Sequence, residues 1–183
     1  MQSYDLSRFS VLVVEDNKYI TSLLVMCMRV LGVGTVKMAT DGGQAIELLK
    51  LMKTDPVRAG MQNVDLVLSN WQMAPVDGLM FLRWIRRHKE SPNRFVPFVM
   101  ITGYADPEHV AAARDLGVTD MLAKPFSINS VADKLVTLIE RPRQFIHTAD
   151  YFGPDRRRRA LPHAGEDRRK LDDKSPTVEV VYE

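Results

Sequence analysis

The stretch SVLVVEDN, residues 10–17, decides the fold. Its first five residues form an apolar run rich in β-branched side chains, which predicts a strand buried on both faces of a parallel sheet. The carboxylates of Glu15 and Asp16 follow at the carboxyl end of that strand. Asn17 is a good helix N-cap, and apolar residues at three- and four-residue spacing occupy residues 18–31. The stretch therefore predicts a buried strand that leads into an amphipathic helix.

The same alternation of strand and helix signals continues along the chain. Further strands are expected at residues 33–40, 64–69, 97–101 and 118–122, and further helices at residues 45–52, 79–88, 107–116 and 128–140. Parallel strands need crossover connections, and both faces of their sheet must be covered. We therefore expect an α/β fold with a doubly wound, five-stranded parallel sheet. In such sheets the ligand site lies beyond the carboxyl ends of the strands, where the strand order reverses.

Composition excludes several classes of protein. The 183 residues are 45% hydrophobic and 26% charged, which suits one domain of ordinary size with an appendage. Apolar stretches such as residues 23–28 are far shorter than the roughly 20 residues of a membrane span, and the N-terminus lacks a signal pattern. We therefore expect a cytoplasmic protein with no membrane partner. The single cysteine, Cys27, and four scattered histidines give no support for a disulfide or a zinc site.

The last part of the chain differs in composition from the rest. Residues 1–140 hold 15 basic and 15 acidic residues, whereas residues 141–183 hold 10 basic and 8 acidic. Dense charge of both signs and few apolar residues predict a domain of residues 1–140 and a charged, mostly disordered tail of residues 141–183. The arginine run 156–159 could neutralise nucleic-acid phosphates, although neighbouring carboxylates oppose this. The terminal TVEVVYE, residues 177–183, alternates well enough to add as a strand to a partner's sheet.

Polar residues gather at the carboxyl ends of the expected strands. Glu15 and Asp16 follow the first strand, Asn70 the third, Thr102 the fourth and Lys124 the fifth. Adjacent carboxylates with a third oxygen ligand form the hard-oxygen environment that Mg²⁺ prefers. A nearby hydroxyl and ammonium could hold the oxygens of a phosphoryl group. Each element alone is a weak signal, but their order along the strand ends makes the combination specific.

This combination resembles the receiver domain of two-component response regulators, the flavodoxin-like or CheY-like fold. The resemblance covers about residues 9–140 and is carried by VLVVEDN, VDLVLSNWQMAPVDG, VMITGYAD and MLAKPF. It implies that Glu15 and Asp16 bind Mg²⁺ and that the residue ending the third strand accepts a phosphoryl group from a histidine kinase or phosphotransfer protein. It further implies that Thr102 is the switch hydroxyl and that Lys124 pairs with the phosphoryl group. By the same resemblance, the Lys124–Pro125 peptide bond is expected to be cis.

The phosphoacceptor position departs from the family pattern. It holds Asn70, whose neutral carboxamide is not a carboxylate nucleophile, so the usual acyl-phosphate chemistry cannot proceed there. Met121 stands where the family often has an aromatic residue, and Ala74 where a proline is usual. We expect weak Mg²⁺ binding through Glu15, Asp16 and the Asn70 carbonyl oxygen, because a third carboxylate is missing. Asn70 fits either a natural pseudo-receiver or a laboratory Asp-to-Asn variant.

These observations favour a single-domain, receiver-like signalling protein of a two-component phosphorelay that acts by docking to partners. We expect it not to be an enzyme, apart from the self-phosphorylation that the family performs. One alternative is a polyanion-binding or nucleic-acid-binding protein that uses the arginine run with the receiver fold as scaffold. A phosphoryl-transfer or hydrolytic enzyme built on Glu15 and Asp16 would need a nucleophile or general base that the sequence does not show.

Overall fold

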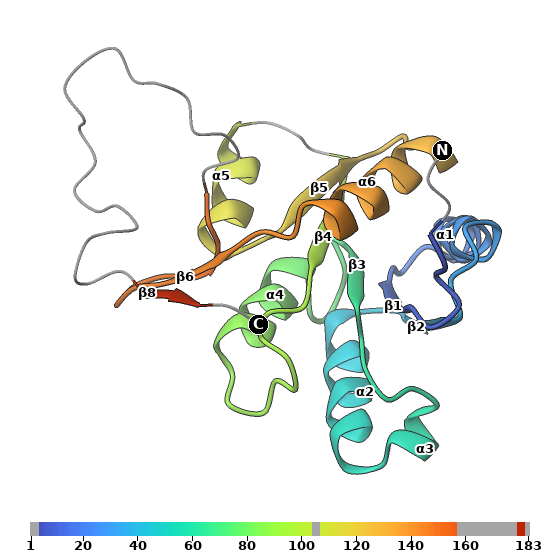
Figure 1. The fold of residues 1–183 in the computed structure, drawn as a ribbon, viewed down its shortest axis with the longest axis horizontal. Helices are drawn as coiled ribbons and strands as arrows, with labels where there is room; N and C mark the ends of the chain where they lie inside the picture. Colours follow the sequence, from blue (N-terminus) through green and yellow to red (C-terminus); the bar gives the residue numbers. More distant parts are fainter. Residues whose placement is uncertain (1–3, 104–106, 157–178, 182–183) are drawn as a thin grey trace.

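The computed structural model of the chain describes residues 4–103, 107–156 and 179–181 (Figure 1). Its centre is a five-stranded sheet in the order β2-β1-β3-β4-β5. The strands of this sheet are β1 (Ser10–Val14), β2 (Thr35–Ala39), β3 (Leu66–Asn70), β4 (Phe98–Thr102) and β5 (Asp120–Ala123). The helices are α1 (Lys18–Val30), α2 (Gly42–Thr54), α3 (Pro56–Ala59), α4 (Gly78–Arg87), α5 (Pro107–Asp115) and α6 (Ile128–Glu140).

All neighbouring strands of this sheet run parallel, which confirms the expected doubly wound architecture. The first strand, β1, pairs with β2 on one side and with β3 on the other. The strand order therefore reverses between β1 and β3, and the crevice at their carboxyl ends is where an open α/β sheet binds its ligand. None of the helices in the described ranges is long and apolar enough to cross a membrane.

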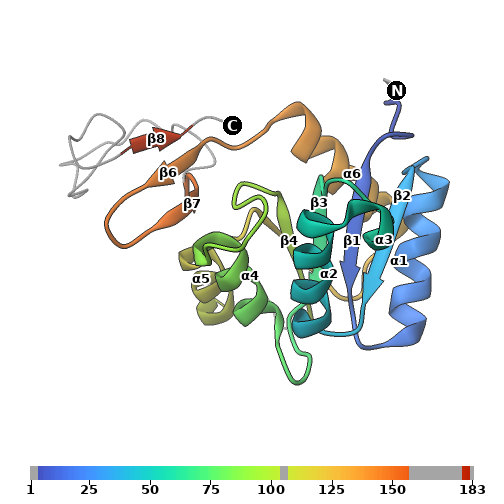
Figure 2. The ribbon, with the colours of Figure 1, turned by 90° about the horizontal axis from the view of Figure 1, so that it is seen from below.

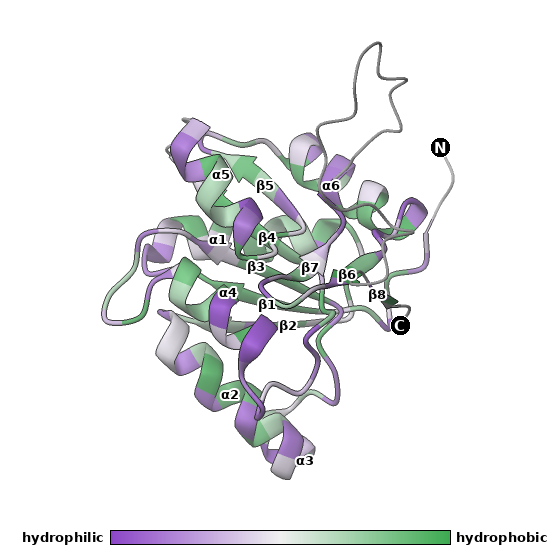
Figure 3. Cartoon of the chain, turned by 90° about the vertical axis from the view of Figure 1, so that its left-hand side faces the viewer, coloured by the Kyte–Doolittle hydropathy of each residue, from purple (hydrophilic) through white to green (hydrophobic). Residues whose placement is uncertain are grey.

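Side chains alternate between the two faces of the sheet and build a core on each. Leu12 and Val14 of β1 belong to the cluster under α2 and α4, while Val11 and Val13 join the cluster under α1 and α6. Figure 2 shows these helices as layers on opposite sides of the strands, and Figure 3 shows hydrophobic residues concentrated along the strands. Because both faces are covered, the three central strands β1, β3 and β4 are buried along their whole length.

Helix starts follow the expected capping chemistry. The Asn17 side chain accepts hydrogen bonds from the first backbone amides of α1, as its position predicted. The short helix α3 lies between the expected helix at residues 45–52 and the expected strand at residues 64–69, where no element was expected. Its signals are nonetheless present, since Asp55 caps it, Pro56 opens it and Gly60 ends it with a φ of +66°.

The main difference from the expected domain boundary lies after Glu140. Strand β6 (Phe145–His147) pairs antiparallel with β7 (Phe152–Pro154) on one edge and with β8 (Glu179–Val181) on the other. The described part of the tail is therefore folded, and β8 lies on this chain's own sheet rather than on a partner's (Figure 1). Most of the arginine run and the rest of the expected disordered segment, residues 157–178, lie outside the described residues.

An aromatic cluster explains why the segment after α6, here called the C-terminal hairpin (residues 145–154), packs on the domain. The buried rings of Phe145 and Phe152 each lie 5.2 Å from the ring of Phe95, measured between centroids. The Arg94 guanidinium lies 3.6 Å from the centre of the Phe152 ring, and that of Arg86 lies 5.2 Å from the Phe145 ring. Local sequence periodicity could not reveal this packing, because its partners are distant along the chain.

A close backbone approach completes the contact. Gly117 has a φ of +89°, and a Cβ atom there would lie 2.8 Å from the carbonyl oxygen of Phe152. A Cβ on Gly153 would in turn lie 2.6 Å from the Cα of Gly117. Gly117 precedes β5, and Phe95 precedes β4. The hairpin therefore packs at the amino ends of these strands, at the far end of the sheet from the crevice (Figure 2).

Candidate functional site

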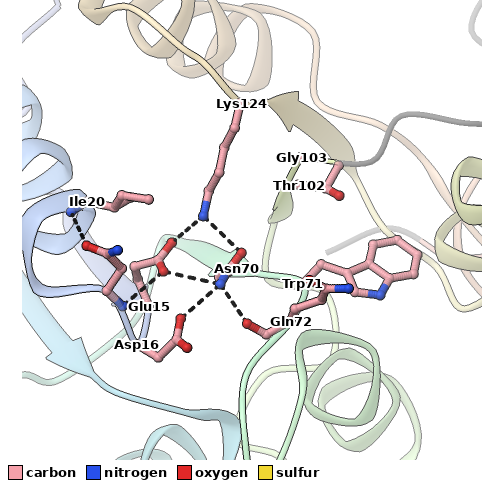
Figure 4. Close-up of a pocket in the computed structure, with 10 residues that line it drawn as sticks. Glu15, Asp16, Ile20, Asn70, Trp71, Gln72, Thr102, Gly103 and Lys124 are labelled. Carbon is pink, nitrogen blue, oxygen red and sulfur yellow. Dashed lines mark hydrogen bonds and ion pairs between the residues drawn. The ribbon is translucent and has the colours of Figure 1, made fainter.

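A pocket of about 290 Å³ opens at the carboxyl ends of β1, β3 and β4 (Figure 4). Its lining consists of Glu15, Asp16, Asn17, Ile20, Asn70, Trp71, Gln72, Thr102, Gly103 and Lys124. The structure therefore brings together all five residues that the sequence analysis placed at the strand ends. Asn17, Trp71 and Gln72 are additional lining residues that were not singled out as site residues.

Glu15 is the buried member of the acidic pair. The Lys124 ammonium donates to its Oε2 at 2.8 Å, and the backbone amide of Asn17 donates to its Oε1 at 3.1 Å. Burial raises the pKa of Glu15 above its ordinary value, because the loss of hydration outweighs the opposing effects of the Lys124 and Asn17 hydrogen bonds. Asp16, by contrast, is exposed at the mouth of the pocket. The site thus holds one buried, lysine-paired carboxylate and one solvated carboxylate.

Asn70 lies at the centre of the site, at the last residue of β3 (Figure 4). Its Nδ2 donates to Glu15 Oε1 at 3.2 Å, to Asp16 Oδ1 at 3.0 Å and to the backbone oxygen of Gln72 at 2.7 Å. Its Oδ1 accepts a hydrogen bond from Lys124 at 3.1 Å. The surroundings dictate this orientation, since acceptors lie on one side of the carboxamide and an ammonium donor on the other.

The remaining expected residues lie beside this centre. Thr102 is buried at the end of β4, and its backbone oxygen accepts the amide of Lys124 at 2.7 Å. Figure 4 shows Thr102 on the opposite side of Asn70 from Glu15. The Lys124–Pro125 bond is cis, in agreement with the expectation. Met121, where the family often has an aromatic residue, is partly buried against the core.

Mg²⁺ fits this arrangement poorly. The oxygens that could hold the cation come from Glu15, Asp16 and the backbone of Gln72, and all three converge on the amide nitrogen of Asn70. The carbonyl oxygen of Asn70, which was expected to be a metal ligand, faces Lys124 instead. In the described part of the chain, moreover, no three His, Cys, Asp or Glu side chains form a group that could hold a metal ion. A hydrogen-bond donor thus occupies the point where the candidate ligands meet.

Comparisons with known proteins agree with this fold. The model of the response regulator receiver domain family matches residues 11–136. Chemotaxis protein CheY-3 from Vibrio cholerae is 30% identical over 131 residues, which cover 72% of this chain and 92% of that protein. The crystal structure of V. cholerae CheY4 is 26% identical, with a TM-score of 0.58, and covers 70% of this chain and 96% of that one.

A solved receiver domain with a metal ion is also similar to this chain. It belongs to a sensor histidine kinase from Pseudomonas aeruginosa and has a magnesium ion coordinated in its active-site cleft. The two chains are 26% identical with a TM-score of 0.58, and the match covers 72% of this chain and 98% of that domain. The fold of that relative therefore accommodates Mg²⁺ in its active-site cleft.

Proposed function

This chain belongs to the response regulator receiver domain family of two-component signalling, and we propose that it signals by docking to partner proteins without phosphorylation at Asn70. The observation that carries the proposal is the neutral carboxamide at the end of β3, held between the acidic pair and Lys124. A carboxamide does not supply the carboxylate nucleophile that forms an acyl phosphate. Without that nucleophile, the chain can still signal through contacts that the surface of its fold makes with partner proteins.

An exposed apolar stripe on α1 supports a docking role. Tyr19, Leu23, Met26 and Val30 are all exposed, and Tyr19 is 88% so. Their successive spacings of four, three and four residues place them along one seam of the helix, as in helices that pair with another helix. We call these four residues the α1 seam. Single exposed apolar residues are common on protein surfaces and need no explanation. A row of them along one side of a helix, by contrast, indicates an interaction site.

The charges beside the α1 seam indicate what kind of partner fits it. The exposed charged residues of α1 are Lys18 and Arg29, and the helix sequence contains no acidic residue. Pairing with a second copy would bring like charges together in either helix direction, because each end of the seam carries a basic residue. We therefore assign the α1 seam to a partner helix that carries acidic residues beside its own apolar stripe.

The position of α1 connects this docking surface with the pocket. Asn17 and Ile20, at the start of the helix, line the pocket whose centre is Asn70. A helix bound along the α1 seam would thus lie at the mouth of the site. Histidine kinases and phosphotransfer proteins are the partners that the family implies, and we propose them as the source of that helix.

Binding to phosphotransfer proteins and kinases encoded in the same genome tests the proposal. We expect the affinity of the unsubstituted chain to be the same with and without a phosphodonor, whereas the affinity of Asn70→Asp changes when the donor is added. Met26→Glu should weaken binding at least about tenfold, as expected for a seam residue. Val57→Glu, which alters a 90% exposed residue of α3, is the matched control and should bind normally. A donor-dependent affinity of the unsubstituted chain would contradict the proposal.

The polyanion-binding alternative gains no support from the described residues. Of the arginine run, Arg156 is described, and its guanidinium pairs with Asp115 at 3.2 Å and lies 4.3 Å from the centre of the Tyr151 ring. These contacts hold Arg156 against the chain itself. The other members of the run, residues 157–159, lie outside the described residues.

A further inference from the structure

We propose that the Asn70 carboxamide takes the place of the cation in this site, so that the pocket is held in one arrangement without Mg²⁺. The inference deepens the proposed function and rests on it, because a receiver that is not phosphorylated has no need of a metal to assist the transfer. Three oxygens surround one nitrogen atom, Asn70 Nδ2.

Those oxygens have separate origins in the chain. Glu15 and Asp16 follow β1, and the backbone oxygen of Gln72 follows β3. The distance to Asn70 Nδ2 is 3.2 Å from Glu15 Oε1, 3.0 Å from Asp16 Oδ1 and 2.7 Å from the backbone oxygen of Gln72. Oxygens that converge on a single point from two loops and carry negative charge form the kind of cluster that binds a hard cation. Here the polar N–H bonds of an amide provide the positive end of a dipole at that point.

The other half of the carboxamide fixes Lys124. Asn70 Oδ1 accepts from the ammonium at 3.1 Å, while Glu15 Oε2 accepts from the same ammonium at 2.8 Å. Lys124 is therefore held by partners inside the pocket with no phosphoryl group present. The neutral side chain of Asn70 thus forms hydrogen bonds with both carboxylates of the acidic pair and with the ammonium of Lys124.

Mg²⁺ can enter only by breaking this arrangement. The cation needs the place of the Asn70 amide nitrogen, so the carboxamide would have to turn its oxygen toward the metal. Its two N–H bonds would then face the Lys124 ammonium, and both groups are donors only. The metal would also draw Glu15 away from Lys124. Metal binding therefore costs the site its internal hydrogen bonds in addition to the usual dehydration of the ion.

Two substitutions separate this inference from a simple effect of charge. Asn70→Asp adds a carboxylate, so either explanation predicts tighter Mg²⁺ binding. Asn70→Ala keeps the charge of the site but removes the amide hydrogens that block the cluster. If charge alone mattered, the unsubstituted chain would bind Mg²⁺ at least as well as Asn70→Ala, since its carbonyl oxygen is a further ligand. If the amide takes the place of the cation, Asn70→Ala binds the metal more tightly.

Calorimetric titration of the full chain with Mg²⁺ measures this order. We expect the affinity to fall from Asn70→Asp to Asn70→Ala to the unsubstituted chain, with at least about a tenfold difference at the last step. Trp71 fluorescence supplies a second readout, because its side chain lines the pocket. The melting temperature should rise in millimolar Mg²⁺ for both variants and stay constant for the unsubstituted chain.

Equal or tighter Mg²⁺ binding by the unsubstituted chain than by Asn70→Ala would overturn the inference. Asn70→Ser gives the same comparison should Asn70→Ala fail to fold, because serine also lacks the amide group. The proposed function fails separately, through a phosphoryl adduct on the unsubstituted chain. Mg²⁺ binding by the unsubstituted chain that is as tight as that of Asn70→Ala, without such an adduct, would leave the proposed function standing and remove only the inference.

Discussion

Phe152→Ala tests whether the C-terminal hairpin is part of the folded domain. Phe152 is 7% exposed, and its ring contacts Phe95, Phe145 and the guanidinium of Arg94. The substitution removes the ring while the backbone of β7 can still pair with β6. It therefore measures the side-chain packing of the hairpin on the domain and leaves the length of the chain unchanged.

The expected loss can be worked out from these contacts. Truncation of a buried phenylalanine to alanine costs about 3–5 kcal/mol, and the position of this cluster at one end of the domain favours the lower figure. The loss of the Arg94 contact is included in that value. A change of about 3 kcal/mol lowers the melting temperature of a chain of this size by about 6–12 °C.

Urea denaturation followed by tryptophan fluorescence gives the free energy of unfolding, and calorimetry gives the melting temperature. Val57→Ala is the control, because Val57 is 90% exposed and its truncation should change stability by less than about 0.5 kcal/mol. A Phe152→Ala protein as stable as this control would show that the hairpin does not pack on the domain. The boundary at Glu140 that the sequence suggested would then stand.

Two further changes probe the same end of the molecule. The buried Arg86 donates hydrogen bonds to the backbone oxygens of Gly117, Arg94 and Val96. Arg86→Met should therefore lower the free energy of unfolding by about 3 kcal/mol in urea denaturation, whereas Arg83→Met, at an exposed position, should be nearly neutral. Equal stabilities of the two variants would contradict a stabilising role of Arg86. Burial raises the pKa of Tyr151 above 10.0, so the folded state holds that proton more tightly than the unfolded state, and stability should fall as the pH rises above 10.0. Tyr151→Phe should lose less stability over that range, and parallel pH profiles of the two proteins would refute the assignment.

The five strand-and-helix units could be predicted from sequence because long apolar stripes and buried runs are local signals. The hairpin could not, since β6 and β7 have three residues each and their stability depends on Phe95 and Arg94, about fifty residues away. The expectation of a mostly disordered tail followed from its charge, and it did not include the packing of residues 145–154 on the domain. Helix α3 had its capping signals at Asp55 and Gly60, although its four residues are too few for periodicity.

The site shows the same division between local and spatial information. The order of acidic pair, Asn70, Thr102 and Lys124 along the strand ends sufficed to expect one cluster, because parallel strands bring their carboxyl ends to one edge. Which way the Asn70 carboxamide turns depends on the backbone oxygen of Gln72 and on the position of the Lys124 ammonium. Neither is encoded in a motif, because any residue at position 72 supplies that oxygen.

The central claim is that Asn70 removes phosphorylation from a receiver fold that otherwise keeps its site residues. Incubation of the chain with acetyl phosphate and Mg²⁺, followed by intact-mass measurement, tests it most directly. We predict that the unsubstituted chain gains no phosphoryl group, whereas Asn70→Asp gains one because its carboxylate restores the nucleophile beside Lys124. A stable phosphoryl adduct on the unsubstituted chain would contradict the account.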